Sequence, residues 1–378
     1  MKILVLNYEF PPVGGGGGKI TQDICRVLAA RGHEIHVATS WFKNLPRHER
    51  LDGYDIFRYQ ALRSRMDRGP AHELAGYVLV QIVPVLKHAY HWKPDLIHCH
   101  FAVPTGIVGW LVSNLLRIPY VLTAHLGDVP GGVPEKTAHI FRHLKPFTVP
   151  IWTQAAAITG VSEFTQQLVN NAYGLNIQVI HNGVDLSGCK PEQVEPYQPP
   201  RLFFAARLQS QKQPLFVLDV LERVKDLPWR MNLAGDGPLM ENVRSRWEAL
   251  ELQERVQLMG WIDSCEVDRH LQLTDVLLMP SLSEGLPIVG IRALAYGVAI
   301  LGSDIPGLNT LVDEGVNGYK PLPGDLDGFE QALRKMLTQP QLLRNMKRES
   351  RRISERFELG KFVDQYEAVY QKVLAARC

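Results

Sequence analysis

The chain has 378 residues, of which 46% are hydrophobic and 21% are charged. This length exceeds what one hydrophobic core usually organises, so we expect two domains. The 41 Lys and Arg residues against 39 Asp and Glu leave a net charge of +2, which gives no general field for nucleic acid. Five scattered cysteines without a CxxC pair argue against a disulfide framework or a structural zinc. The start of the chain is too poor in apolar residues for a signal peptide or a membrane span, so we expect a cytoplasmic protein.

Short apolar runs alternate with amphipathic stretches in the first half of the chain. A glycine loop follows the first run and is itself followed by Ile20, Ile24 and Leu28 at helical spacing, with Gly32 placed to end that helix. Apolar strands that alternate with helices are typical of a parallel sheet covered on both faces. The expected strands lie in KILVLN (2–7), HEIHVATS (33–40), DLIHCHF (95–101), YVLTAH (120–125) and AAAITGVS (155–162).

This rhythm breaks at the proline-rich segment GCKPEQVEPYQPP (188–200) and then restarts. Further strands are expected in RLFFAARL (201–208), WRMNLAG (229–235), RVQLMG (255–260), DVLLMPS (275–281) and VAILGS (298–303). We predict a Rossmann-like domain at 1–188, a linker at 189–200, a second Rossmann-like domain at 201–355, and a C-terminal helix at 356–378 that packs on the first domain. Two doubly wound domains joined by a hinge would place the carboxyl ends of both sheets around one cleft.

Five consecutive glycines, Gly14 to Gly18, follow the first strand within EFPPVGGGGGK. Their amides precede a helix, which favours an anionic ligand. A dinucleotide-binding loop is one alternative, but the connection is long and no acidic residue ends the second strand region. A flexible loop without a ligand is another.

Two further segments carry residues suited to a phosphorylated ligand. Arg207 and Lys212 follow the first strand of the second domain and could neutralise a diphosphate leaving group, although surface solvation is an alternative. Glu284 stands in SEGLPIVG, where Pro287 suits a first helical turn and the amides around Ile288 would form another anion seat.

In this order and spacing, the motifs resemble those of retaining glycosyltransferases of family 4, over essentially the whole chain. The resemblance rests on the glycine loop and on LTAHLGD, ITGVSE, VIHNGVD, ARLQSQK, LAGDGP and PSLSEGLP. It implies an α/β GT-B fold of two facing Rossmann-like domains with a C-terminal helical segment. It also implies a hexosyltransferase that moves a sugar from a nucleotide-diphosphate sugar to a glycan, glycolipid or small molecule, with no cofactor and no metal.

The resemblance assigns roles to residues of both domains. His125 would lie beside the transferring sugar, although a hydrogen-bonded structural histidine is the alternative, and Trp261 would lie near the nucleobase unless it packs in the core. The implied catalytic residues are His125, Glu284, Arg207 and Lys212. The implied donor-binding residues are Gly15, Gly16, Gly17, Arg207, Lys212, Gly235, Trp261, Ile262, Glu284, Gly285, Leu286, Pro287, Ile288 and Arg292, and the acceptor-side residues are His100 and Ser162.

Arg292 departs from the family pattern, which has a second glutamate there that accepts hydrogen bonds from ribose hydroxyls. A guanidinium cannot accept a hydrogen bond, but it can donate one or pair with Glu284. Three interpretations remain open: an active transferase that holds the ribose otherwise, a site that reads an additional phosphate on an unusual donor, and a degenerate subunit without turnover. A dinucleotide-dependent enzyme is the rival class.

Three weaker signals complete the sequence analysis. We interpret Asp325 in GDLDG as a helix N-cap and not as a metal ligand. We expect His98 and His100 on opposite faces of a strand, which is unlike a zinc pair. A basic cluster (Arg58, Arg63, Arg65 and Arg68) beside the apolar stretch 77–93 indicates either a buried helix with a solvated face or peripheral contact with the inner face of a membrane that carries a lipid-linked acceptor.

Overall fold

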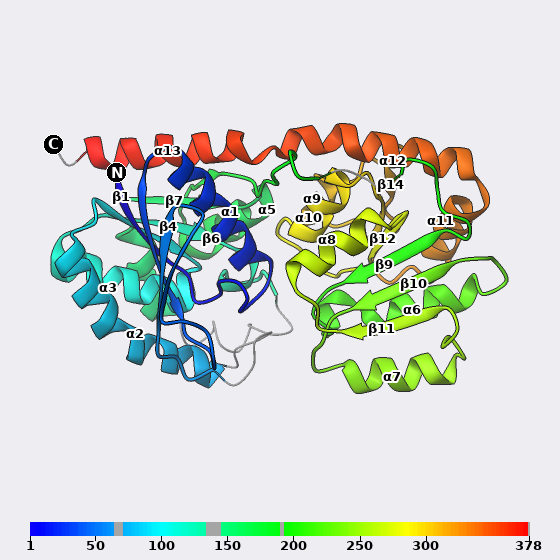
Figure 1. Cartoon of the computed structure of the whole chain (residues 1–378), viewed down its shortest axis with the longest axis horizontal. Coiled ribbons are helices and arrows are strands. Elements are labelled where there is room, and N and C mark those ends of the chain that lie inside the picture. The colour runs from blue at the N-terminus through cyan, green and yellow to red at the C-terminus, as the bar shows by residue number, and fades with distance from the viewer. Residues whose placement is uncertain (64–70, 134–144, 190–192, 377–378) are drawn as a thin grey trace. The chain divides into compact units, whose positions relative to one another are not determined.

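The computed structural model describes residues 1–63, 71–133, 145–189 and 193–376 (Figure 1). The chain forms two compact units: the N-terminal unit, Met1–Gly183 with Leu359–Cys378, and the C-terminal unit, Val184–Glu358. Each unit contains a mainly parallel sheet with helices packed on it, as the alternating apolar runs predict.

The N-terminal unit holds, within its described residues, an eight-stranded sheet in the order β3-β4-β2-β1-β5-β6-β7-β8. Its pairs are parallel except for the antiparallel pair of β3 and β4. The chain builds outward from β1 through β2 and β4, then returns to add β5 on the other side of β1. This reversal makes the carboxyl ends of β1 and β5 the switch point, where ligands bind in such sheets. The strands are β1 (Lys2–Leu6), β2 (Glu34–Ser40), β3 (His48–Leu51), β4 (Tyr54–Tyr59), β5 (Leu96–His100), β6 (Tyr120–Ala124), β7 (Ala157–Gly160) and β8 (Gln178–Val179).

Helices cover this sheet, and the first of them begins inside the glycine run. Gly15 is the N-cap of α1, so Gly16 to Gly18 form its first turn instead of an open loop. Gly32, with a φ of +86°, follows the end of α1 as expected. The last helix, α13, packs against α1, where Glu367 accepts a hydrogen bond from Arg31. The helices are α1 (Gly16–Ala30), α2 (Ala71–Trp92), α3 (Ile107–Leu116), α5 (Glu163–Tyr173) and α13 (Leu359–Ala375), and residues 145–153 are also helical.

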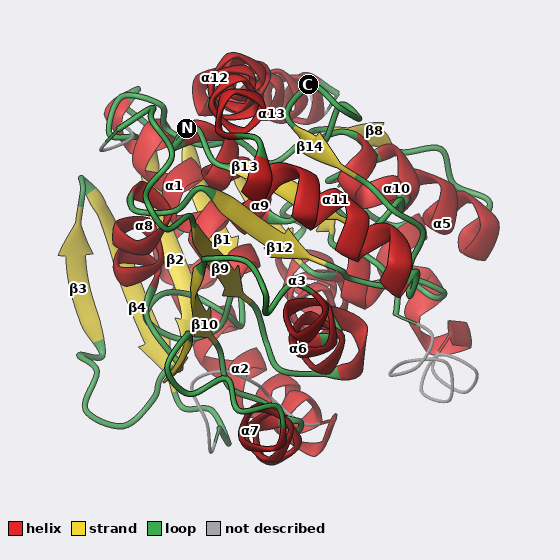
Figure 2. Cartoon of the chain, turned by 90° about the vertical axis from the view of Figure 1, so that its right-hand side faces the viewer, coloured by secondary structure: helices red, strands yellow, loops and turns green. Residues whose placement is uncertain are grey.

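The C-terminal unit repeats the design with a six-stranded parallel sheet, counted over its described residues, in the order β11-β10-β9-β12-β13-β14. Figure 2 labels β9, β10, β12, β13 and β14 of this sheet. Its switch point lies at the carboxyl ends of β9 and β12. The strands are β9 (Arg201–Ala205), β10 (Arg230–Ala234), β11 (Val256–Gly260), β12 (Val276–Met279), β13 (Ala299–Gly302) and β14 (Gly318–Tyr319). The helices are α6 (Pro214–Arg223), α7 (Met240–Ala249), α8 (Ser264–Gln272), α9 (Ile288–Ala295), α10 (Pro306–Asn309), α11 (Leu326–Thr338) and α12 (Pro340–Ser354).

Two of the local expectations are settled by the fold. Asp325 is the N-cap of α11 and accepts the amide of Gly328, so that prediction is confirmed. The expectation for His98 and His100 is wrong, because their ring centroids lie 4.2 Å apart. Residues two apart on a strand share one face, and the alternation applies to neighbours.

Candidate active site

A lysine and a glutamate meet at the switch point of the C-terminal unit. Lys212 ends the 3-10 turn η3 (Ser210–Lys212), and its Nζ lies 2.5 Å from Oε1 of the buried Glu284. The Ser281 hydroxyl donates to the same oxygen at 2.7 Å. The Gln211 side chain donates to the Ser283 carbonyl at 2.7 Å, which ties the loop after β9 to the loop after β12. Two of the predicted site residues are therefore direct partners across 72 positions of sequence.

Backbone amides surround this pair. Pro287 is the N-cap of α9, and its carbonyl accepts from Gly290 and Ile291, which leaves the amide of Ile288 at the open end of the helix. Such an end, with Gly285 and Leu286 leading into it, favours an anion. Arg207 follows β9 on the same edge of the sheet and is partly buried.

The first glycine of LAGDGP, Gly235, lies where the ends of β9, β10 and β11 come close together. Gly235 has a φ of +146°, its amide donates to the Gly260 carbonyl at 2.7 Å, and a Cβ there would lie 1.9 Å from the Ala206 carbonyl oxygen. Trp261 follows β11 with 37% of its surface exposed, so core packing is not its role in the unit. Its neighbour Ile262 is partly buried.

Arg292 does not pair with Glu284. It lies on α9 and donates to Oδ2 of Asp268, which belongs to α8. Both side chains are mostly buried, at 12% and 21% exposure. The positive charge that departs from the family pattern is therefore balanced by a carboxylate 24 residues earlier in the chain.

The switch point of the N-terminal unit holds the glycine turn against a buried carboxylate. The amide of Gly15 donates to Oε2 of Glu9 at 3.1 Å. A Cβ on Gly14, whose φ is +96°, would lie 2.4 Å from the Glu9 Cβ, so only glycine fits. Gly16 and Gly17 continue this turn into α1. Sequence analysis did not single out Glu9, although its place directly after β1 was a usable signal.

Two buried histidines of the same edge are neutral. His100 and His125 lie at the ends of β5 and β6, with Nδ1 of His100 3.3 Å from Nε2 of His125. Burial lowers the pKa of His125 to about 4, against a smaller rise from Glu9, and lowers the pKa of His100 well below its usual range. At neutral pH these imidazoles offer hydrogen bonds and no charge.

Two other predicted residues have structural partners. Ser162 is the buried N-cap of α5 and accepts the Thr165 amide at 3.2 Å. Arg58, from the basic cluster, is 3% exposed and pairs with Glu49, so it is not a surface cation. Arg63 is described, whereas Arg65 and Arg68 lie outside the described residues.

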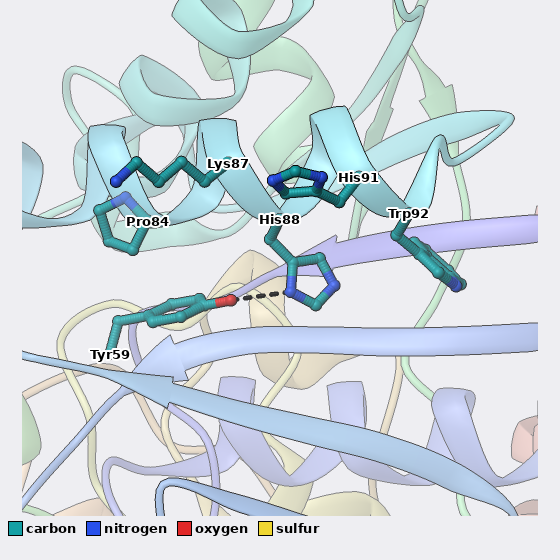
Figure 3. A pocket seen from close by; sticks show the side chains of 6 residues that line it. All are labelled: Tyr59, Pro84, Lys87, His88, His91 and Trp92. Carbon is teal, nitrogen blue, oxygen red and sulfur yellow. Dashed lines mark hydrogen bonds between the residues drawn. The ribbon is translucent and has the colours of Figure 1, made fainter.

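A pocket of about 570 Å³ lies along α2 of the N-terminal unit (Figure 3). The Tyr59 hydroxyl and Nδ1 of His88 are 2.8 Å apart, and burial lowers the pKa of His88 to about 4. Its lining is mainly aromatic and carries one cation, Lys87, so it suits contact with the apolar face of a ring. The pocket is lined by Tyr59, Pro84, Lys87, His88, His91 and Trp92.

Two other features are absent from the described residues. None of these residues form a group of three or more His, Cys, Asp or Glu side chains that could hold a metal ion. In the same part of the chain, no helix combines the length and the hydropathy that crossing a bilayer requires.

Comparison with known sequences assigns both halves of the chain. Residues 14–187 match Glycosyltransferase Family 4, and residues 190–353 match Glycosyl transferases group 1. The chain belongs to glycosyltransferase family 4. The enzyme therefore uses a nucleotide sugar as its donor, and the family resemblance seen in its motifs is confirmed.

Individual relatives agree with this assignment. The transferase is 27% identical to N-acetyl-alpha-D-glucosaminyl L-malate synthase of Bacillus anthracis, over 99% of this chain and 98% of that protein. It is 26% identical to UDP-Gal:alpha-D-GlcNAc-diphosphoundecaprenol alpha-1,3-galactosyltransferase of Escherichia coli, over 77% of this chain and 78% of that protein. The structure of sucrose-phosphate synthase from Thermosynechococcus elongatus matches with a TM-score of 0.85 at 20% identity and 99% coverage of both chains, which shows the GT-B fold.

Proposed function

We propose that the transferase moves a hexosyl group from a nucleotide-diphosphate sugar to a hydroxyl of a glycan, glycolipid or small molecule, with retention of anomeric configuration. The single observation that supports this most directly is the Lys212 and Glu284 pair beside the open end of α9. A cation and helix amides suit a departing diphosphate, and a buried carboxylate suits sugar hydroxyls.

The reaction we propose runs on one face of the sugar. The bond from C1 to the diphosphate oxygen breaks, the acceptor oxygen bonds to C1 from the same side, and the acceptor proton passes to the departing phosphate. Arg207 and Lys212 would take up the developing charge. His125, neutral and buried, would donate or accept a hydrogen bond at the sugar without changing its own charge.

The ion pair of Arg292 favours, among the three interpretations, an active transferase with an ordinary nucleotide-diphosphate donor. Because Asp268 balances its charge, the guanidinium has less to offer an additional phosphate. We propose that ribose recognition uses another acceptor or a hydrogen bond donated by Arg292. Losing one carboxylate acceptor costs roughly 1–3 kcal/mol, which weakens donor binding without abolishing it.

A calorimetric and thermal-shift screen of UDP, GDP, ADP and their sugars tests the donor. Selective binding by one nucleotide, retained in Arg292→Gln, which keeps a hydrogen-bond donor for Asp268, is the expected result and names the donor. Slow hydrolysis of that nucleotide sugar without an acceptor, with an α-anomeric product by NMR from an α-linked donor, would support retention. If wild type binds none of the nucleotides and hydrolyses none of the sugars, the proposed donor site is wrong.

The acceptor proposal includes a lipid-linked molecule at a membrane surface. Leu79, Val83 and Tyr90 lie on the outward stripe of α2 with exposures of 76%, 56% and 63%, and the cation Lys87 lies among them. The Escherichia coli relative is named for a diphosphoundecaprenol substrate. Apolar side chains beside a cation suit an anionic interface.

Vesicle sedimentation tests this contact. Binding to vesicles with anionic lipid should fall in Leu79→Glu and stay unchanged in the control Leu322→Glu, which alters a residue of the C-terminal unit with 64% exposure. Equal sedimentation of wild type and Leu79→Glu would contradict a membrane contact through α2.

A further inference from the structure

Three loops of the N-terminal unit converge on Phe101, directly after β5. Its φ of +72° lies in a region that bulky side chains rarely occupy, which is a sign of a backbone held for function. The Phe101 ring stacks on His125 with centroids 4.2 Å apart, and Tyr8 contacts it edge-on at 5.1 Å. On the glycine side, a Cβ on Gly17 would lie 2.6 Å from the tip of this ring. Phe101 therefore separates the glycine turn from His125 at the switch point.

One carboxylate holds this arrangement. Oδ2 of Asp128 accepts the Ala102 amide at 2.6 Å, and Oδ1 accepts the His125 amide at 2.8 Å. In return, the imidazole of His125 accepts the backbone amide of Asp128. The loops after β5 and β6 are thus joined through Asp128, one residue away from the strained Phe101.

These contacts also define the protonation of His125. Nε2 lies 3.3 Å from Nδ1 of His100, and the His125 side chain accepts the Asp128 amide. We infer that Nδ1 is the accepting nitrogen and that the neutral ring carries its proton on Nε2. Phe101 therefore holds the orientation of the His125 ring by stacking on it, and the Asp128 amide holds its tautomer.

The charges around Asp128 give the arrangement a pH dependence. Asp128 is 3% exposed, and burial raises its pKa to about 7 although three backbone amides lower it. Two titratable residues interact with Asp128: His125 through its backbone amide, and Tyr173 electrostatically. His98, His100 and Glu9 interact in turn with His125. Burial holds the pKa of His98 at about 3 and that of His125 at about 4, so these rings stay neutral when Asp128 ionises. Ionisation of the carboxyl group strengthens both hydrogen bonds, because bonds to a charged acceptor are stronger than bonds to a neutral one.

We propose that Asp128 is a positioning residue of the transferase, which fixes Phe101 against His125 and thereby sets the ring orientation and tautomer that the reaction uses. The inference rests on the proposed role of His125 at the transferring sugar. Asp128 itself is not assigned a contact with the substrate.

The first test does not depend on activity. Nitrogen NMR of the histidine rings, with His125 assigned by His125→Gln, should show an Nε2-protonated ring in wild type at pH 8. Asp128→Asn, which retains one acceptor oxygen, should change that tautomer balance. The control Asp95→Asn makes the same change at another carboxylate of this unit, one that accepts the Lys2 amide at 2.7 Å, and should leave His125 unchanged.

The second test measures hydrolysis of UDP-galactose and UDP-glucose without acceptor. In wild type, kcat should rise with pH through about 7, and Asp128→Asn should remove this rise and lower kcat about 100-fold with KM within twofold. Phe101→Leu, at a partly exposed side chain, should lower kcat about tenfold and serves if Asp128→Asn does not fold.

The outcomes separate the two proposals. Wild-type hydrolysis that persists unchanged in Asp128→Asn or in Phe101→Leu, with an unchanged His125 tautomer, overturns the positioning role. If wild type binds none of UDP, GDP and ADP and hydrolyses none of their sugars, the donor proposal is overturned, whereas the NMR result still decides whether Asp128 sets the His125 ring.

Discussion

At the carboxyl ends of β9 and β12 the C-terminal unit holds the charged pair of Lys212 and Glu284, and helix α9 that follows β12 carries Arg292, which pairs with Asp268. At the matching edge of β5 and β6 the N-terminal unit gathers neutral imidazoles around one buried carboxyl group. The two edges share a topology and differ in chemistry. Fixed charges suit the recognition of a charged group, whereas neutral rings held by amides suit the placing of an uncharged one. We propose that the same α/β design serves both halves of the transfer reaction.

Breaking the buried ion pair of Lys347 and Asp275 in the C-terminal unit should have the largest effect on stability. Lys347 Nζ lies 2.7 Å from Oδ1 of Asp275, and their side chains are 2% and 0% exposed. Asp275 also accepts the Arg201 amide at 2.9 Å, so this pair joins α12 to the sheet. Lys347→Met should lower the free energy of unfolding by about 3–5 kcal/mol in urea titration, because it leaves a buried carboxylate.

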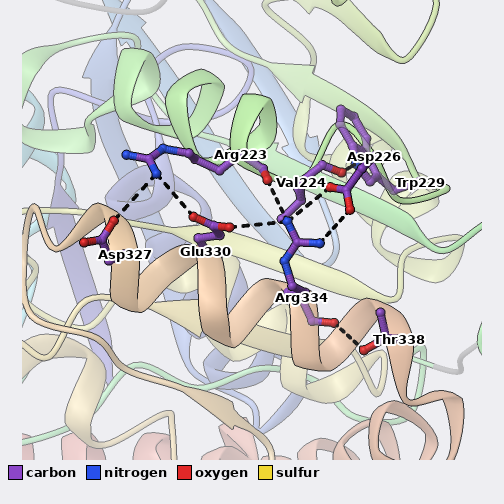
Figure 4. A network of polar contacts seen from close by, with 8 residues as sticks. All are labelled: Arg223, Val224, Asp226, Trp229, Asp327, Glu330, Arg334 and Thr338. Carbon is purple, nitrogen blue, oxygen red and sulfur yellow. Dashed lines mark hydrogen bonds and ion pairs between the residues drawn. The ribbon is translucent and has the colours of Figure 1, made fainter.

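A surface network provides the control for that prediction. Arg334 donates to Asp226 at 2.7 Å on the exposed side of α11, with Glu330 beside it (Figure 4). Asp226→Asn should shift the urea midpoint far less than Lys347→Met, because exposed pairs are screened by water and salt. Equal shifts would remove the distinction between buried and exposed charge in this unit.

The carboxyl ends of β5 and β6, with neutral His100 and His125 around Asp128, form what we call the neutral edge. There, ionisation of a buried group should lower stability instead of raising it. The folded-state pKa of Asp128 is raised to about 7, above its unfolded value, so the contribution to stability is full below the unfolded pKa and is lost as pH rises through about 7. A shift of this size corresponds to as much as roughly 4 kcal/mol. The free energy of unfolding of Asp128→Asn relative to wild type should therefore improve between pH 5 and pH 8. A difference independent of pH would show that Asp128 does not ionise at neutral pH in the fold.

Catalysis should depend on the charged edge through Lys212. Lys212→Met should lower kcat/KM about 100-fold, or roughly 2–3 kcal/mol, because the departing diphosphate loses a charge-assisted partner. Lys225→Met, which removes an exposed pair to Glu222 in the same unit, should leave kcat/KM within twofold. If both variants retain wild-type kcat/KM, the charge at the switch point has no role in the transfer.

The sequence predicted the architecture better than the contacts. Apolar runs located ten strands, but they missed β4 and the polar edge strand β3, and β8 and β14 are only two residues long. The motif loops lie at the two switch points because parallel strands end on one edge. The partners were not predictable, since Lys212 meets Glu284 across 72 residues and Arg292 meets Asp268 across 24. No local sequence pattern indicates which residues so far apart in the chain will pair.

The N-terminal edge was harder to read than the C-terminal edge. LTAHLGD contains both His125 and Asp128, and the HxxD spacing of a reciprocal cap was a usable signal for Asp128. Nothing in the sequence indicates that Phe101 adopts a positive φ, because glycine, asparagine and aspartate are the residues that usually mark it. A strained backbone of this kind can be recognised only from the three-dimensional structure.

The smallest expected effect tests whether the neutral edge works by packing. Gly17→Ala pushes a Cβ against the Phe101 ring and should lower kcat/KM about tenfold through overpacking.

A double variant shows whether the two residues act through each other. If the two sites act independently, Gly17→Ala combined with Phe101→Leu should lower kcat/KM about 100-fold. If the ring is the obstacle, the double variant should be no worse than Phe101→Leu alone, because the shorter side chain makes room. Gly127→Ala, where a Cβ meets nothing within 4 Å, should leave activity unchanged and isolate the steric term. A multiplicative loss in the double variant would mean that the glycine turn and the Phe101 ring do not act through each other, and that the neutral edge is organised by its hydrogen bonds alone.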